Sequence, residues 1–186
     1  MPNKLNLSGI LIKPVLIENN GGITFEFHIG KGSPANPLFF TNPALVKILQ
    51  KKQGDYLSEG MVLGEWHYYK NNYIPSENPI LEENIRTFHF VKESKELNGI
   101  GIARGLEEKV LSELKKRYGV FRVIPFGNAN SRRASSLTRR GIAVRYIGAL
   151  KGEALHTYDA GSSEMFQTLR MKKRARRRIS QIIRKR

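Results

Sequence analysis

A glycine-rich segment near the middle of the chain has residue types that could bind phosphate groups. It reads Asn-Gly-Ile-Gly-Ile-Ala-Arg-Gly-Leu over residues 98–106 and leads into a stretch with helical periodicity. Glycines leave backbone N–H groups uncovered by side chains, and the N-terminus of a following helix adds partial positive charge. The segment lacks the Gly-Lys-Ser/Thr of a Walker A loop. It also has one residue too many before Gly105 for a dinucleotide fingerprint.

The same segment resembles the pyrophosphate loop of the GNAT superfamily of N-acyltransferases. The family pattern is Gln/Arg-x-x-Gly-x-Gly/Ala, with a leucine three residues after the last member. Asn98 takes the first position, and the other positions match at Gly101, Ala103 and Leu106. A later run is similar to the family's Asn…Ala…Leu-Tyr…Gly-Phe run, at Asn130, Ala134, Leu137 and Gly141. The resemblance covers roughly residues 85–147.

This resemblance implies a fold of the α/β class, with the mixed sheet of an α+β protein. The sheet would be a GNAT-like mixed β-sheet flanked by helices. It would be splayed where acetyl-coenzyme A (acetyl-CoA) inserts between two central strands. The pyrophosphate would rest on the backbone amides of residues 99–104. The cofactor-binding residues that it implies are Asn98, Gly99, Ile100, Gly101, Ile102, Ala103, Arg104 and Asn130.

The reaction that the resemblance implies is direct attack of an amine on the thioester. A base or a water chain removes the amine proton, and backbone N–H groups polarise the carbonyl. Two candidates for that base are Glu65, on an expected strand that also carries Trp66, and His89, on the strand before the glycine loop. The family's usual general-acid tyrosine would fall near Thr138, and the chain has no tyrosine between Tyr118 and Tyr146.

No other catalytic centre stands out in the sequence. The chain has no cysteine, which excludes disulfides, thiol nucleophiles and Cys-based metal sites. The four histidines (28, 67, 89 and 156) are scattered without metal-ligand spacing. Glu82 and Glu83 adjoin, and because neighbouring side chains point apart, we expect a solvated turn there and not an acid/base pair.

The positive charge is concentrated in the second half of the chain. Residues 1–90 have a net charge of zero, whereas residues 91–186 carry the whole formal charge of +16. Within that half, residues 132–151 hold six basic groups and residues 170–186 hold ten, and neither stretch contains an acid. Such asymmetry favours a polyanionic partner, because each phosphate contact releases counterions.

We therefore predict binding to RNA, DNA or a ribonucleoprotein. The residues expected to make the contacts are Arg132, Arg133, Arg139, Arg140, Arg170, Lys172, Lys173, Arg174, Arg176, Arg177, Arg178, Arg184, Lys185 and Arg186. Two hypotheses remain open: an N-acetyltransferase brought to nucleic acid by its basic tail, or a non-catalytic protein on the same scaffold that belongs to a nucleoprotein assembly such as a ribosome, nucleoid or virion.

Hydrophobic periodicity predicts the elements that would position these residues. A β-hairpin is expected from strands 9–17 and 23–29 around an Asn-Asn-Gly-Gly turn. A loop over 30–41 precedes a helix over 42–53, and strands are expected over 60–69 and 85–91. A helix from Leu106 to Gly119 leads to a strand over 120–126. A short helix is expected over 131–140, and two strands over 142–147 and 154–158. A basic C-terminal helix begins at Ser162.

These elements predict one GNAT-like domain over residues 1–161, followed by a basic tail over 162–186. Within the domain, residues 1–84 form a divergent N-terminal half and residues 85–147 form the coenzyme-binding core. The chain shows no secretion signal and no apolar run long enough for a transmembrane helix. We expect a cytoplasmic protein, or one associated with a nucleoid or virion, and not a secreted one.

Overall fold

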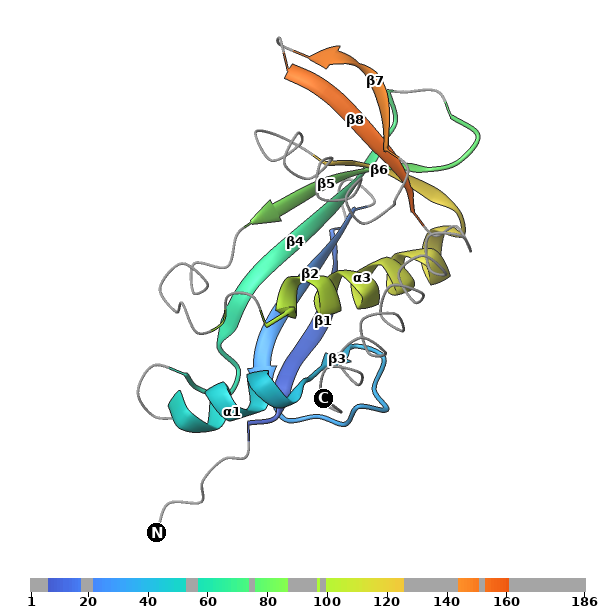
Figure 1. Ribbon diagram of the computed structural model, residues 1–186. Helices are drawn as coiled ribbons and strands as arrows, with labels where there is room; N and C mark the ends of the chain where they lie inside the picture. The colour runs from blue at the N-terminus through green and yellow to red at the C-terminus, as the bar shows by residue number, and fades with distance from the viewer. Residues whose placement is uncertain are drawn as a thin grey trace, which may run out of the picture. The chain divides into compact units, whose positions relative to one another are not determined.

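A computed structural model describes most of the chain up to residue 160 (Figure 1). The described residues are 7–17, 22–52, 57–73, 76–86, 97, 100–125, 144–150 and 153–160. They fall into two compact units, each described in turn. The first comprises the described residues up to Lys70 together with those from Asn84 to Glu113, and the second comprises Asn71–Glu83 together with those from Leu114 onwards.

The sheet of the first unit is built on a β-hairpin. Strand β1 (Gly9–Ile17) pairs antiparallel with β2 (Gly22–Gly30) along its whole length, from Gly9 opposite Gly30 to Ile17 opposite Gly22. Strand β4 (Val62–Asn71) pairs antiparallel with the other edge of β2, and the short β3 (Phe39–Phe40) pairs antiparallel with β1. The strand order in this unit is therefore β3-β1-β2-β4.

The two faces of this sheet differ in chemistry. One face carries large apolar side chains that are fully or almost fully buried, namely Ile10, Ile12, Phe25, Phe27, Trp66 and Tyr68. Phe27 meets Trp66 edge-on with ring centroids 4.9 Å apart, and Phe25 meets Tyr68 edge-on at 5.9 Å. Such pairs add to the stabilisation from burying the rings. Because side chains alternate along a strand, the other face receives polar residues of β2 and β4.

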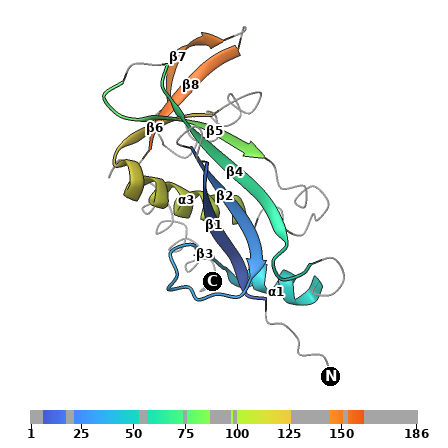
Figure 2. The ribbon, with the colours of Figure 1, turned by 180° about the vertical axis from the view of Figure 1, so that it is seen from behind.

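Two helices contribute apolar side chains to the same core. Helix α1 (Pro43–Lys52) buries Leu45 and Leu49, and the first part of α3 (Ile102–Tyr118) buries Leu106 and Val110. The two ribbon views show this first part of α3 running across one face of β1 and β2 (Figures 1 and 2). Gly105 lies directly against the Phe40 ring, where a Cβ atom would overlap the ring. A glycine at this helical position therefore allows α3 to approach β3 closely.

The second unit contains both parallel and antiparallel strand pairs. Strand β5 (Ile80–Arg86) pairs in parallel with β6 (Phe121–Pro125), from Ile80 opposite Arg122 to Glu83 opposite Pro125. Strand β8 (Glu153–Ala160) pairs antiparallel with both β6 and β7 (Val144–Leu150). The strand order here is β5-β6-β8-β7. Helix α3 lies between the two parallel strands in the sequence, so β5, α3 and β6 form a β–α–β succession.

The structure confirms an α+β class with mixed strand pairing. The hairpin, helix α1, and the strands over 60–69 and 120–126 were all predicted near their observed positions. The strand expected over 85–91 was placed too late, because β5 begins at Ile80 and buries Ile80 and Leu81. The loop expected over 30–41 includes the short strand β3. The helices expected over 131–140 and from Ser162 lie outside the described residues.

Candidate functional site

The N-terminus of α3 has the backbone features that the glycine-rich segment predicts. Gly101 is exposed and has a φ of 86°, a left-handed conformation that side chains rarely adopt, with open space where a Cβ would lie. The amide of Gly105 donates to the carbonyl of Gly101 at 3.0 Å, which closes the first turn of the helix. The amides of residues 102–104 belong to that turn, where N–H groups have no acceptor within a helix. Arg104, half-buried, adds a guanidinium to the same turn.

Three contacts hold this end of α3 against residues 37–42, which include β3. Asn42 caps α1, because its Oδ1 accepts a hydrogen bond from the Leu45 amide at 2.7 Å. Its Nδ2 donates to the carbonyl of Ile100 at 3.2 Å. About two turns into α3, Lys109 Nζ donates to the carbonyl of Pro37 at 2.8 Å. Together with the Gly105–Phe40 contact, these bonds hold the start of α3 in one position.

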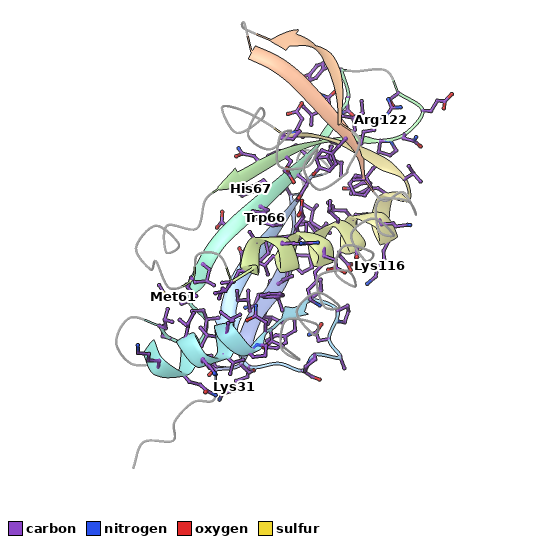
Figure 3. All side chains as sticks on the ribbon, viewed as in Figure 1. Lys31, Met61, Trp66, His67, Lys116 and Arg122 are labelled. Atoms are coloured by element: carbon purple, nitrogen blue, oxygen red, sulfur yellow. The ribbon has the colours of Figure 1, made fainter. Side chains whose placement is uncertain are left out.

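A separate polar cluster lies on the second face of the first unit's sheet. Its members are Thr24, Glu26 and His28 on β2, and Glu65 and His67 on β4. The cross-strand register places Thr24 opposite His67 and Glu26 opposite Glu65. Figure 3 labels His67 beside Trp66 on β4; these neighbours belong to opposite faces, so Trp66 enters the core and His67 joins the cluster.

Within the cluster, His67 contacts a hydroxyl and a carboxylate through its two ring nitrogens. Thr24 Oγ1 lies 2.8 Å from Nδ1, and Glu65 Oε2 lies 3.3 Å from Nε2. The Tyr69 ring stacks on the imidazole with an interplanar angle of 13°. Thr24 and His67 are 8% and 9% exposed, whereas the Glu65 side chain is 37% exposed. The imidazole is thus bonded to the Thr24 hydroxyl and flanked by the Tyr69 ring, and the partly exposed Glu65 carboxylate lies at ion-pair distance from Nε2 without a hydrogen bond to it.

The remaining two members form a second imidazole–carboxylate pair. His28 Nε2 lies 2.8 Å from Glu26 Oε2, and His28 Nδ1 lies 3.2 Å from the carbonyl of Gly60. Glu26 and Glu65 are direct cross-strand neighbours, an arrangement that brings like charges together and costs stability. Each carboxylate has an imidazole two residues further along its own strand, and Lys13 is the partner of Glu26 on β1. These neighbours offset part of the repulsion.

The second unit contains a buried carboxylate–phenol pair. Tyr158 on β8 donates its hydroxyl to Glu83 Oε1 at 3.2 Å, and the two residues are 1% and 2% exposed. Glu82 lies on the same strand, half-buried, and accepts a hydrogen bond from Asn71 Nδ2. The expectation of a solvated turn at Glu82-Glu83 is therefore wrong: both residues lie in β5, whose pairing with β6 takes Glu83 into the interior.

The sequence-predicted residues are distributed as follows. Glu65 lies in the polar cluster, and Ile100, Gly101, Ile102, Ala103 and Arg104 lie at the start of α3. No hydrogen bond or ion pair joins Glu65 to residues 100–104 in the part of the chain that the structure describes. His89, Asn98, Gly99 and Asn130 lie outside the described residues. So do all the basic residues predicted to bind nucleic acid, at 132–140 and 170–186.

Sequence reasoning missed Thr24 and His67 as a pair and Glu83 and Tyr158 as another. The period-two pattern of β2 already placed Thr24, Glu26 and His28 on one face, and Glu65 and His67 share a face for the same reason. The sequence does not contain the register between strands that lie 43 residues apart, and that register brings Thr24 to His67. For Glu83, the neighbouring Glu82 led to the prediction of a solvated turn, whereas both residues lie in β5.

Two features are absent from the described residues. No group of three or more His, Asp or Glu side chains there is arranged to hold a metal ion. No helix within the same ranges combines the length and the apolar character needed to cross a membrane.

No protein-family model matches the sequence, and no curated protein matches it. Among solved structures, the chain is similar to an uncharacterized protein (bh2621) from Bacillus halodurans, with a TM-score of 0.45 and 12% sequence identity. The match covers 87% of this chain and 95% of that chain.

We predict that the Glu83–Tyr158 bond contributes to stability. Tyr158→Phe keeps the ring but leaves the buried Glu83 carboxylate with one donor fewer, so the free energy of unfolding should fall by about 1–3 kcal/mol. Tyr73→Phe is the matched control, because Tyr73 is 92% exposed. Urea unfolding followed by circular dichroism measures both variants. Equal unfolding free energies for the two would show that the hydroxyl contributes nothing.

Proposed function

We propose that this chain is a GNAT-like N-acetyltransferase that transfers the acyl group of acetyl-CoA to an amine, and that its basic C-terminal segment brings it to nucleic acid or a ribonucleoprotein. The observation that carries the proposal is Gly101, in a left-handed conformation and in open space, directly before the N-terminus of α3. This is where the resemblance of residues 98–106 expects a pyrophosphate.

The residues present fit an anionic diphosphate. The amides of residues 102–104, the partial positive charge of the helix N-terminus and the half-buried Arg104 all favour a negative ligand. Position 101 lies in open space and has a left-handed backbone conformation, which glycine adopts without strain. The succession β5–α3–β6, with its parallel strand pair, supports the same proposal because the expected loop leads from a strand into a helix.

For the chemistry, bound acetyl-CoA would supply an activated thioester. An amine that attacks it must lose a proton, and in this proposal Glu65 accepts that proton. Its carboxylate is partly open to solvent, so an amine can reach it, and the His67 ring lies 3.3 Å away. Because the Glu65 side chain is 37% exposed, it can pass the proton on to solvent and so be restored for the next cycle. His89 remains a second candidate for the base.

The basic segment supports delivery to a polyanion. Ten basic residues and no acid occur among residues 170–186, and seven of the ten are arginines. Arginine binds phosphate oxygens through two parallel N–H donors, which lysine cannot do. A non-catalytic role in a nucleoprotein assembly would use the same residues. Binding of acetyl-CoA separates the two hypotheses, because only the first needs it.

We predict that acetyl-CoA raises the melting temperature of the full chain. Ligand at 100 times its Kd stabilises a protein by about 2.7 kcal/mol, and each kcal/mol corresponds to roughly 2–4 °C for a chain of this size. Arg104→Glu should remove most of the shift, because it places a negative charge in the first turn of α3. Lys116→Glu, the same charge change at the exposed far end of the helix, is the control and should keep the shift.

Differential scanning fluorimetry with and without acetyl-CoA measures these shifts. Absence of a shift at millimolar ligand would overturn the acetyltransferase proposal. A shift of equal size in the unaltered chain and in Arg104→Glu would place the ligand somewhere other than the start of α3.

A second prediction concerns the basic segment. Deleting residues 170–186 should weaken binding to duplex DNA or RNA and flatten its dependence on salt. The slope of log K against log[salt] changes by about 0.9 for each lost phosphate contact on B-DNA. The control replaces Lys116 and Arg117, two exposed basic residues in the last turn of α3, by glutamine. Fluorescence anisotropy at several salt concentrations gives the slopes, and the same slope with and without residues 170–186 would refute the role of this segment.

A further inference from the structure

Thr24, His67 and Glu65 lie in the order nucleophile, base and orienting acid. Thr24 Oγ1 is 2.8 Å from His67 Nδ1, and His67 Nε2 is 3.3 Å from Glu65 Oε2. A hydroxyl within hydrogen-bond reach of an imidazole is the pairing that activates serine and threonine nucleophiles. The Glu65 carboxylate lies at ion-pair distance from the other ring nitrogen, without a hydrogen bond to it. Neither the glycine loop nor the basic segment takes part in this arrangement.

The tautomer of His67 sets which way the Thr24 proton points. An ionised Glu65 favours the proton of a neutral imidazole on Nε2, the nitrogen nearest to its carboxylate. Nδ1 is then left as an acceptor, so the Thr24 hydroxyl donates to it. The hydroxyl oxygen keeps its lone pairs for attack, while its proton already lies on the path to the base.

The surroundings hold this geometry while leaving an approach. Stacking on Tyr69 fixes the plane of the imidazole, and the burial of Thr24 and His67 limits competition from water. Val15, the cross-strand partner of Thr24 on β1, is 44% exposed. An acyl chain can therefore lie on Val15 next to the hydroxyl, and the partly exposed Glu65 borders the other side.

We propose that Thr24 is an acylatable nucleophile and that the chain cleaves activated acyl esters through an acyl-Thr24 intermediate. Thr24 Oγ1 attacks the ester carbonyl while its proton passes to His67 Nδ1. The bond from the carbonyl carbon to the leaving group breaks, and the leaving group takes the electron pair and the proton from the imidazolium. Water, deprotonated by the same imidazole, then attacks the acyl-Thr24 ester and releases the carboxylic acid and the free hydroxyl.

This activity does not rest on the proposed function, because it needs no coenzyme. p-Nitrophenyl acetate is the appropriate probe, since its phenolate is a good leaving group and the activation of the hydroxyl then limits acylation. The full chain should release p-nitrophenolate in a burst and acquire one acetyl group, which intact-mass measurement detects. Peptide mapping should place that group on Thr24.

Four variants test the assignment. Thr24→Val, which replaces the hydroxyl by a methyl group, should lose the burst and the adduct, and Thr24→Ser should keep both. His67→Gln should slow acylation by about 10²- to 10⁴-fold. His28→Gln is the matched control, because His28 lies on the same sheet face and pairs with a glutamate in the same way, but does not contact Thr24; it should stay within about twofold of the unaltered chain.

Circular dichroism and thermal melting establish that each variant is folded. If Thr24→Val does not fold, the Thr24→Ser and His67→Gln results and the mapped site decide the question. Acetyl groups found only on lysines or the N-terminus, or no acetylation at all, would overturn the proposal. So would equal acylation rates in His67→Gln and His28→Gln. None of these outcomes depends on whether acetyl-CoA binds, so a failure here and a failure of the proposed function are distinguishable.

Discussion

The register between β2 and β4 is the constraint on which the rest of the first unit depends. It places Phe25 opposite Trp66 and Ile23 opposite Tyr68, and burial of these side chains against the apolar sides of α1 and α3 stabilises that register. A slip by one residue would move every large side chain of one strand to the other face. The cost would be several buried aromatic groups at about 1.5–3 kcal/mol each, so the register has no close competitor.

The polar cluster is a consequence of the same register. Once Phe25 and Trp66 are anchored in the core, the residues beside them in the chain, Thr24 and His67, must meet on the opposite face. The aromatic core therefore fixes which residues of β2 and β4 face each other, and this places the imidazole beside the Thr24 hydroxyl. At the start of α3 the position of the helix depends on two other contacts. The absence of a side chain at Gly105 lets the helix contact Phe40. Asn42 caps α1 and also donates a hydrogen bond to the carbonyl of Ile100, just before α3.

Sequence periodicity predicted what depends on local pattern. The hairpin around residues 18–21, helix α1 and strand β6 follow from alternation, capping and apolar spacing, and all were placed within a few residues. Glu65 was singled out, but as an isolated carboxylate on a strand. Its relation to Thr24 depends on pairing across 43 residues, which no local pattern encodes. The solvated turn predicted at Glu82-Glu83 was wrong. Both residues lie in β5, and pairing of β5 with β6 takes Glu83 into the interior.

In the proposed acylation, the β2–β4 register makes His67 a base directed at the Thr24 hydroxyl. Long-range ¹H–¹⁵N NMR of the His67 ring, recorded at about pH 8 where a free imidazole is neutral, tests it most directly. We expect the proton on Nε2 and an Nδ1 resonance typical of an acceptor, which should move in Thr24→Val but not in His28→Gln. A ring protonated on Nδ1, or an Nδ1 resonance indifferent to the loss of the Thr24 hydroxyl, would contradict the account.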